Sequence, residues 1–453
     1  MSTTHTPPTS NAVPASQLKE GEHIVGDGVV AKQRPAASTA SWIITLFGTA
    51  VGAGILFLPL NAGGFGFWPL VFATVFIFPL VYFSHRTYAR IVAGAPTKDH
   101  GKDILELVSQ YLGKGQGIIF AVLYWITVFS TVLIYGVSIT NAVDSFIVNQ
   151  LGGPSLDRWL LAMLCVGVMT GAFAIGRKPM IWLAQVLVYP LIIALAVTSI
   201  YLIPRWDLHS FIHFDDGSNG YGGIIKGIFL ILPVLVFSFS HMAALSQFAI
   251  DMQPQYGEKT EKRVSRTEFY TAILLVVFTM FFVWSCVLAL GADGMNEALE
   301  QNIPVLSYFA NVTGTPFMAY MAPIVVICAI VSSYFGHMLG TEEGTEYLLK
   351  NAAPKLAEKV SHRTLLNIIY LIAFVCTTLV AIFNPSIISM ISVVSGVFVA
   401  FIVYLVPVYM FKKLDVYKQF RNDPWNYFVF GMGLLIMAVT SWAMISKGRE
   451  NAS

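Results

Sequence analysis

The architecture of this chain depends most on one stretch of sequence, Gly48-Thr49-Ala50-Val51-Gly52-Ala53-Gly54-Ile55. It lies in the middle of an apolar run over residues 41–62, which is long enough to cross a bilayer. Three glycines in seven residues weaken a helix, by up to about 1 kcal/mol each relative to alanine. Two interpretations follow. The glycines allow close helix packing through Gly48-xxx-Gly52, or the helix is unwound at mid-membrane, where free carbonyls and amides can bind a cation and a carboxylate.

The composition indicates that lipid is the solvent for most of the chain. Of its 453 residues, 56% are hydrophobic and 11% are charged, whereas soluble domains carry about 25% charged residues. The net charge of +2 provides no field that favours nucleic acid. The four cysteines lack CxxC spacing, which argues against metal and redox sites. We therefore expect an all-α membrane protein.

Hydropathy predicts eleven transmembrane helices preceded by a disordered cytoplasmic tail over residues 1–40, which is rich in Ser, Thr, Pro and Ala. The predicted spans are 41–62, 66–84, 117–142, 157–175, 180–203, 223–249, 269–291, 317–340, 364–383, 386–411 and 426–446. The ninth and tenth are separated only by Asn384-Pro385-Ser386, where the proline disfavours a continuous helix. Short amphipathic helices are also expected at 103–112 and 343–351.

The distribution of Lys and Arg predicts the orientation. If the amino terminus is cytoplasmic and eleven helices alternate, the cytoplasmic segments contain 22 of the 27 basic residues. The other five are Arg158, Arg205, Lys226, Lys447 and Arg449. This asymmetry obeys the positive-inside rule in every loop. We expect a bacterial inner membrane protein whose carboxyl terminus is periplasmic.

The sixth predicted span also carries polar groups at its centre. It reads Pro233-Val234-Leu235-Val236-Phe237-Ser238-Phe239-Ser240-His241-Met242. Polar side chains at that depth are costly unless they have partners. The serines could bond back to their own helix around a buried neutral histidine, or the segment could bind substrate, with His241 relaying protons because its unperturbed pKa is about 6.5.

Polar residues of the third and eighth spans could complete a site. The third span contributes Tyr135 and Asn141, and the eighth contributes the adjacent Ser332 and Ser333. The two hydroxyls could join a sodium cage, or the serines could be there because small residues allow helices to pack. Both interpretations stay open.

Signatures of other protein classes are missing from the sequence. It contains no HExxH, GxSxG or Walker motif, so an enzyme or an ATP-driven pump is not expected. The centres of the first five spans carry no Asp, Glu, Lys or Arg, so no carboxylate ring of a channel can be drawn there.

Several stretches together resemble the hydroxy and aromatic amino acid permease family, in particular its bacterial serine and threonine permeases. They include the run from Gly48 to Gly63, Ile134-Tyr135-Gly136-Val137-Ser138-Ile139-Thr140-Asn141 and Gln301-Asn302-Ile303-Pro304. The resemblance covers essentially everything after residue 40. It implies a leucine-transporter-like fold with a 5+5 inverted repeat (41–203 and 223–411), broken helices 1 and 6, and an extra helix within 412–453.

The resemblance also implies the site residues. Thr49, Ala53 and Gly54 would meet a substrate carboxylate, aided by Tyr135 or Asn141, and Phe237, Ser238, Ser240 and His241 would face the amino group or side chain. A sodium site is suggested by a departure from the family rather than by the resemblance: with no lysine at position 332, a sodium ion could bind the carbonyls of Gly48 and Val51 and the hydroxyls of Ser332 and Ser333.

Two departures from the family pattern bear on specificity and coupling. Where serine permeases tend to have Asn-His-Ser-Pro, this chain has Ser240-His241-Met242-Ala243, which could suit a more apolar substrate. Ser332 stands where similar family members tend to have a lysine that can replace sodium.

The expected function is import of a small neutral amino acid by symport with sodium ions or protons, without any cofactor. Its partners would be the amino acid, the coupling cation and the lipid bilayer, with no nucleic acid and an oligomeric state that the sequence leaves open. A passive facilitator or channel, or an amino acid sensor, is the alternative. A channel would show flux without gradient coupling, and a sensor would need a signalling domain.

Overall fold

The computed structural model describes residues 22–25, 29–32, 38–175, 177–213 and 221–450. Apart from one pair of strands, the regular structure in this part of the chain is helical. The strands β1 (Glu22–Val25) and β2 (Val29–Lys32) pair antiparallel, so part of the tail predicted to be disordered is a hairpin. The rest of that tail before Ser38 lies outside the described residues.

Each of the eleven predicted spans coincides with helix. In chain order the helices are α1 (Thr39–Ala50) with α2 (Ala53–Gly64), α3 (Phe67–Ala93), α5 (Lys114–Ser145), α6 (Arg158–Gly171), α7 (Arg177–Leu202), α9 (Tyr221–Leu230) with α10 (Leu232–Phe239) and α11 (Met242–Tyr256), α12 (Thr260–Glu300), α14 (Pro316–Ala352), α16 (His362–Phe383), α17 (Ile387–Val393) with the π-helical η7 (Val394–Leu405) and α18 (Val406–Lys413), and α19 (Trp425–Glu450). Shorter elements connect them: η2 (Thr97–Asp99), α4 (Ile104–Leu112), η3 (Phe146–Gln150), η4 (Ala172–Ile175), η5 (Ile203–Arg205), α8 (Leu208–His213), η6 (Gly257–Lys259), α13 (Val305–Thr313), α15 (Pro354–Ala357) and η8 (Asp415–Phe420).

Within the described residues, nine helices are long and apolar enough to cross a membrane, or ten if the bent pair α1 and α2 forms one span. The fourth predicted span is the shorter helix α6, and the sixth is divided at residues 240–241. The chain is therefore a multi-span helical membrane protein, and the count of eleven stays a prediction.

Backbone conformations that favour glycine or asparagine end several spans near the predicted residues. Gly291 has a φ of 69° and kinks α12 where the seventh span was predicted to end. Asn384 adopts the left-handed conformation (φ 49°) and ends α16 directly before Pro385. Two predictions were wrong in detail: α3 continues nine residues past 84, and residues 343–351 continue α14 rather than forming a separate helix.

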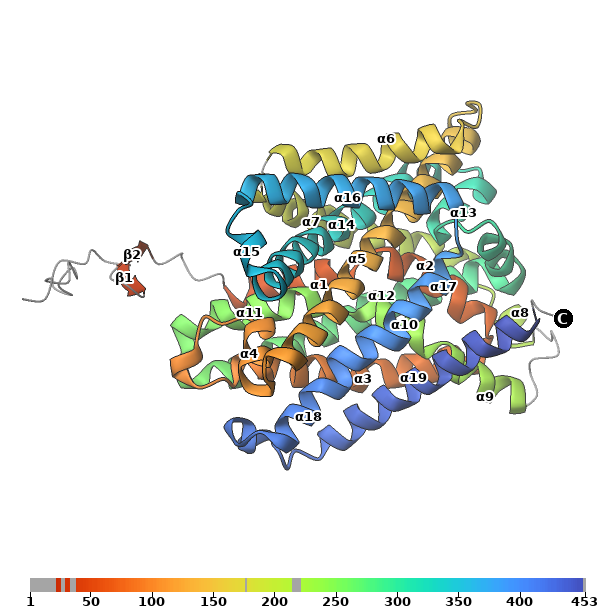
Figure 1. The fold of residues 1–453 in the computed structure, drawn as a ribbon. Coiled ribbons are helices and arrows are strands. Elements are labelled where there is room, and N and C mark those ends of the chain that lie inside the picture. The colour runs from red at the N-terminus through yellow and green to blue at the C-terminus, as the bar shows by residue number, and fades with distance from the viewer. Residues whose placement is uncertain (1–21, 26–28, 33–37, 176, 214–220, 451–453) are drawn as a thin grey trace, which may run out of the picture.

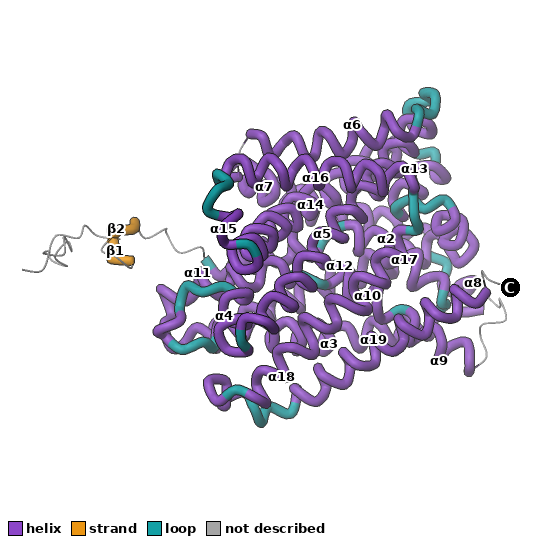
Figure 2. Tube along the Cα trace, in the orientation of Figure 1, coloured by secondary structure: helices purple, strands orange, loops and turns teal. Residues whose placement is uncertain are grey.

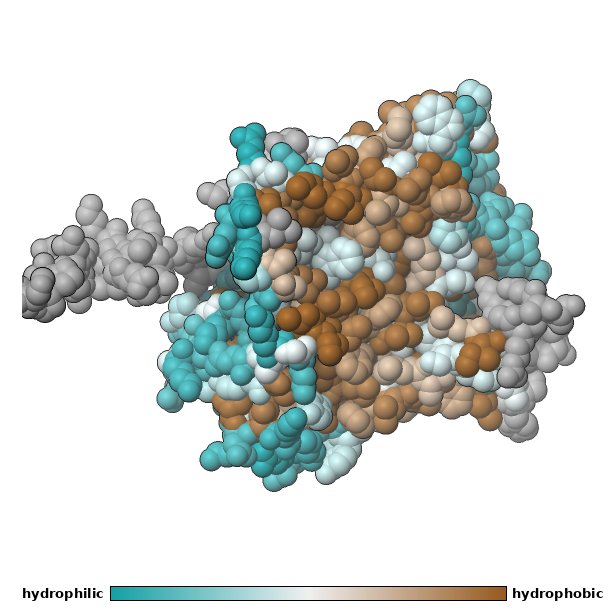
Figure 3. Space-filling model, viewed as in Figure 1, coloured by the Kyte–Doolittle hydropathy of each residue, from teal (hydrophilic) through white to brown (hydrophobic). Residues whose placement is uncertain are grey.

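The long helices run side by side (Figures 1 and 2). At the centre, α5 packs along α14, while α12 lies against α2 and α3, and α19 lies against η7. Figure 3 shows a hydrophobic band over the middle of the visible face and hydrophilic residues at its ends. The predicted cytoplasmic segments α4, α15 and the end of α18 gather at one of those ends (Figure 1).

Candidate functional site

The first predicted span is interrupted within the glycine-rich stretch. Helices α1 and α2 meet at an angle of 57°, separated by Val51 and Gly52 in extended conformations. A Cβ atom on Gly52 would lie 2.5 Å from the Ser333 hydroxyl oxygen and 2.7 Å from that of Tyr135. A Cβ on Gly48 would lie 2.2 Å from the Val188 side chain in α7. Both interpretations of this stretch therefore apply, since the helix is broken and its glycines also permit close packing.

The sixth predicted span is interrupted as well. Helix α10 ends at Phe239 and α11 begins at Met242, while Ser240 between them is extended (φ −76°, ψ 124°). Helix α10 lies close to α2, because a Cβ on Gly54 would come within 2.8 Å of the Ser238 Cα atom. Each break exposes the terminal carbonyls of one half-helix and the first amides of the next.

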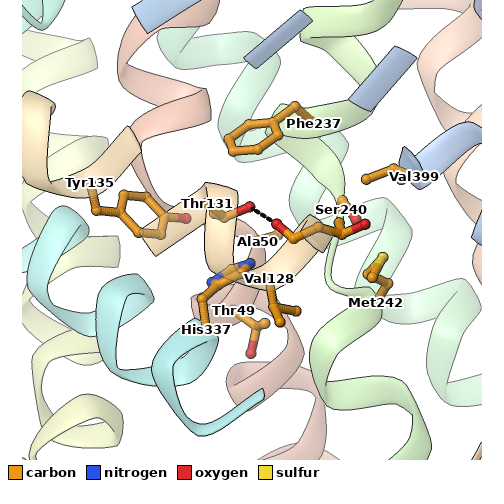
Figure 4. Close-up of a pocket in the computed structure, with 11 residues that line it drawn as sticks. Thr49, Ala50, Val128, Thr131, Tyr135, Phe237, Ser240, Met242, His337 and Val399 are labelled. Carbon is orange, nitrogen blue, oxygen red and sulfur yellow. Dashed lines mark hydrogen bonds between the residues drawn. The ribbon is translucent and has the colours of Figure 1, made fainter. Parts of the chain in front are cut away.

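A small pocket lies where the two breaks meet α5, α14 and η7 (Figure 4). About 370 Å³ of space there is free of protein atoms, part of it open to solvent. Its lining residues are Thr49, Ala50, Thr127, Val128, Thr131, Tyr135, Phe237, Ser240, Met242, His337 and Val399. The wall thus combines hydroxyl groups with apolar side chains and contains no formal negative charge.

Four predicted substrate residues line this pocket: Thr49, Tyr135, Phe237 and Ser240. The Tyr135 ring also packs edge-on against His337, with ring centroids 5.5 Å apart. Two other predicted substrate residues, Ala53 and Gly54, are buried in the first turn of α2. The polar groups that they could present to a substrate are their backbone amides. The Ser238 hydroxyl donates to the Val234 carbonyl at 2.7 Å, so this serine bonds back to its own helix, which is one of the two interpretations of this segment given above.

Asn141 lies outside the pocket, in a polar network near the predicted outer face. Its amide donates to the Asn302 carbonyl (2.7 Å) and the Asn384 side chain (3.0 Å). Its oxygen accepts from the Arg158 guanidinium at 2.7 Å. Asn302 and Asn384 are the two non-glycine residues with positive φ among the described residues, so this network holds two strained turns and α6 together.

His241 also faces away from the pocket, toward α3 and α12. Its Nε2 atom is 2.8 Å from a carboxylate oxygen of Glu268, and both side chains are fully buried. Its ring stacks on that of His85, with centroids 4.1 Å apart. The buried cluster of His85, His241 and Glu268 is therefore a separate feature on the other side of the helix break.

The structure brings together two of the four predicted sodium ligands. The Ser333 hydroxyl donates to the Val51 carbonyl at 3.0 Å, so these two oxygens lie close enough to share a cation. The Ser332 hydroxyl instead donates to Ala329 of its own helix at 3.2 Å. Gly48 lies one turn before Val51, in the last turn of α1.

Sequence reasoning missed part of the site. Thr127 and Thr131 line the pocket from one face of α5, and their i,i+4 spacing in an apolar run was an available signal. Val399 offers no such signal, because it is one apolar residue among many in its span. Glu268 lies one residue before the predicted start of the seventh span, so the hydropathy pattern did not indicate that it is buried.

The chain is similar to several known transporters. The profile of the tryptophan/tyrosine permease family matches residues 35–447. The serine transporter SdaC of Escherichia coli (strain K12) is 36% identical over 408 residues, covering 89% of this chain and 94% of the relative. The threonine/serine transporter TdcC of Escherichia fergusonii is 34% identical over 420 residues, covering 88% and 94%.

A solved structure shares the fold at low sequence identity. The crystal structure of a mutant manganese transporter from Eremococcus coleocola has a TM-score of 0.58 at 12% identity, covering 91% of this chain and 86% of that one. This likeness bears on the fold alone. Because the family profile matches nearly the whole chain, this protein belongs to the tryptophan/tyrosine permease family.

Proposed function

We propose that this protein is a secondary active transporter that carries a small neutral amino acid of the serine or threonine type across a membrane, driven by a sodium or proton gradient. The observation that carries the proposal is the pocket between two interrupted helices, lined by hydroxyl groups and apolar side chains. The names of the relatives, which are serine and threonine/serine transporters, support the substrate class.

The half-helix ends supply the chemistry that a zwitterion needs. The first amides of α2, at Ala53 and Gly54, would bind the carboxylate, because a helix amino terminus carries partial positive charge. The last carbonyls of α1 would accept hydrogen bonds from the ammonium group. Thr131 and Ser240 would bond a substrate hydroxyl, and Met242 would contact a methyl group.

The finer architecture belongs to the same proposal. Eleven spans with a cytoplasmic amino terminus would form two inverted five-helix repeats, and each break would then fall in the first helix of its repeat. The gathering of basic segments at one polar end supports an inner membrane orientation with that end in the cytoplasm. Transport would proceed by rocking one group of helices against the rest.

If the coupling cation is sodium, its candidate site is the predicted set of Gly48, Val51, Ser332 and Ser333. The proximity of the Val51 carbonyl and the Ser333 hydroxyl supports it. Ser333→Ala removes one of the two adjacent oxygens and should weaken the sodium dependence of uptake more than it lowers stability. If sodium dependence in that variant equals that of the unmodified protein, the sodium set is wrong.

The whole proposal is tested with purified protein in liposomes. A panel of labelled amino acids should be offered under a sodium gradient and, separately, under a pH gradient. Accumulation of serine or threonine above the external concentration supports a coupled transporter. Equilibration without accumulation would indicate a passive facilitator, and binding without flux would indicate a sensor.

A further inference from the structure

The buried cluster of His85, His241 and Glu268 has no role in the pocket. His241 lies in the break between α10 and α11, His85 lies in α3, and Glu268 lies in α12. Their exposed fractions are 0% for His241 and Glu268 and 1% for His85. Within the described part of the chain, the second carboxylate oxygen of Glu268 has no hydrogen-bond partner. A carboxylate in that position is costly as an anion unless a positive charge or a proton neutralises it.

The contacts of His241 determine how many protons the cluster holds. Its Nδ1 atom is 3.1 Å from the Phe239 carbonyl, which can only accept, so Nδ1 carries a hydrogen. Its Nε2 atom is 2.8 Å from Glu268, and both ring contacts are hydrogen bonds at the same time only when one further proton lies between that nitrogen and the carboxylate. Whether that proton sits on His241 or on Glu268, the pair is neutral overall and holds one proton more than a neutral histidine beside an ionised glutamate.

His85 is neutral in this arrangement. Its Nδ1 atom is 3.0 Å from the Val81 carbonyl and so carries the hydrogen, while its Nε2 atom accepts from the His241 backbone amide at 3.3 Å. A second hydrogen on His85 would remove that acceptor and place two positive rings 4.1 Å apart whenever His241 is charged. The exchangeable proton therefore belongs to His241 and Glu268.

The surroundings contain few other ionisable groups. From η7, Tyr404 reaches the cluster only through Ser84, whose hydroxyl is 3.1 Å from His85. From α14, His337 lies on the pocket side and bonds to the Ser333 carbonyl at 2.9 Å. Helix α1 contributes no ionisable side chain. The charged side chain that His241 contacts is that of Glu268.

Resting on the proposed transport function, we propose that His241 and Glu268 together form the binding site for the coupling ion, and that this ion is a proton. Loss of the proton leaves the His241 ring with a single hydrogen, which can bond to the Glu268 carboxylate or to the Phe239 carbonyl but not to both, so one of the two bonds that hold the helix break is lost. Binding of the proton restores the bond. Protonation thereby controls the position of the same helix break that contributes Ser240 and Met242 to the substrate pocket.

Glu268→Gln tests the site, because a glutamine amide can donate to His241 permanently and cannot release a proton. In liposomes with the membrane potential held at zero, a pH difference of one unit allows about tenfold accumulation of a neutral substrate for one proton carried. Unmodified protein should accumulate labelled L-serine or L-threonine toward that limit. Glu268→Gln should exchange internal for external substrate but show no accumulation, and its exchange rate should lose the pH dependence of the unmodified protein.

Glu261→Gln is the matched control. It makes the same change two helical turns earlier in α12, where the carboxylate pairs with Arg90 at 2.7 Å and is partly exposed, and it should keep pH-driven accumulation. If neither reconstituted variant is obtained, a pH dye outside liposomes of unmodified protein should report alkalinisation when L-serine enters without a sodium gradient.

Three results would overturn the assignment: pH-driven accumulation by Glu268→Gln, accumulation by the unmodified protein that follows sodium alone, or serine entry without proton movement. In each of these cases transport itself still occurs, so the proposed function would survive. Failure of the unmodified protein to move any amino acid would instead reject the proposed function, and the assignment with it.

Discussion

At residue 52, the break in the first span has room for the hydrogen of a glycine but not for the methyl group of an alanine. A Cβ atom at residue 52 would lie 2.5 Å from the Ser333 hydroxyl oxygen, 2.8 Å from the Ser333 Cβ atom and 2.7 Å from the Tyr135 hydroxyl oxygen. Ser333 is a short side chain on α14, and its hydroxyl already bonds to the Val51 carbonyl. Gly52→Ala must therefore displace either α14 or the break itself.

The cost of Gly52→Ala follows from these contacts. Overpacking a tight site costs about 1–3 kcal/mol, and losing the bond from Ser333 to Val51 adds about 0.5–1.5 kcal/mol. A strain of about 2 kcal/mol on the arrangement that binds substrate corresponds to a loss of affinity of roughly 30-fold. Because the strain lies at the pocket, binding should suffer more than the integrity of the rest of the protein.

The assay is binding of labelled L-serine to purified protein, together with thermal unfolding in detergent. Gly431→Ala is the control, since a Cβ there meets nothing within 4 Å. The double variant Gly52→Ala with Ser333→Gly removes two of the three crowded atoms and should recover part of the affinity. Equal serine affinity in Gly52→Ala, Gly431→Ala and the unmodified protein would refute the reasoning.

Other expected outcomes concern parts of the protein away from the pocket. Asn141→Ala removes the hydrogen bonds that Asn141 makes to Arg158, to the Asn302 carbonyl and to Asn384, and should lower stability by about 1–3 kcal/mol, while serine affinity stays unchanged; a changed affinity at unchanged stability would place Asn141 in the site after all. Burial alone would raise the pKa of Asp423, but bonds from Arg90, the Trp425 amide and Arg86 lower it below its ordinary value. The ionised carboxylate thus stabilises the folded protein above about pH 4, and this stabilisation is lost on acidification. Asp423→Asn should therefore unfold at a lower temperature than the unmodified protein at pH 7, and its unfolding temperature should lose the decline that this carboxylate causes as the pH falls. An equal decline of the unfolding temperature in both proteins would contradict this. Gly396→Ala would bring a Cβ in η7 to 1.9 Å from the hydroxyl oxygen of Thr440 in α19. Helix α19 should then pack less closely on η7 and become more sensitive to protease. Unchanged digestion of this variant would argue against the packing of α19 on η7.

Much of the fold could be predicted because the signals are local. Burial in lipid is decided residue by residue along about 20 positions, so hydropathy located the spans. Interruption of a helix depends on residues that weaken its backbone conformation, so the glycines at 48–54 made a break one of the two interpretations of that stretch. The resemblance to a permease family is confirmed by the family match, and with it the expectation that the chain is not an enzyme.

Tertiary structure decided which polar groups meet. Sequence placed His241 in the middle of one predicted span and Asn141 near the end of another, but the direction of each side chain depends on how several helices rotate against each other, and that rotation is set by contacts between distant segments. Asn141 meets Asn302 and Asn384, and His241 meets Glu268 across the α11–α12 hairpin.

The sequence by itself determined which segments are apolar enough to cross a membrane, because this follows from the free energy of transferring each residue to lipid. Residue by residue it left both helix breaks open as one of two interpretations, and the family resemblance is what implied them. Only the packed structure decided that one face of the second break meets the pocket and the other meets a buried carboxylate, because a side chain finds its partner only after the helices have settled into one arrangement.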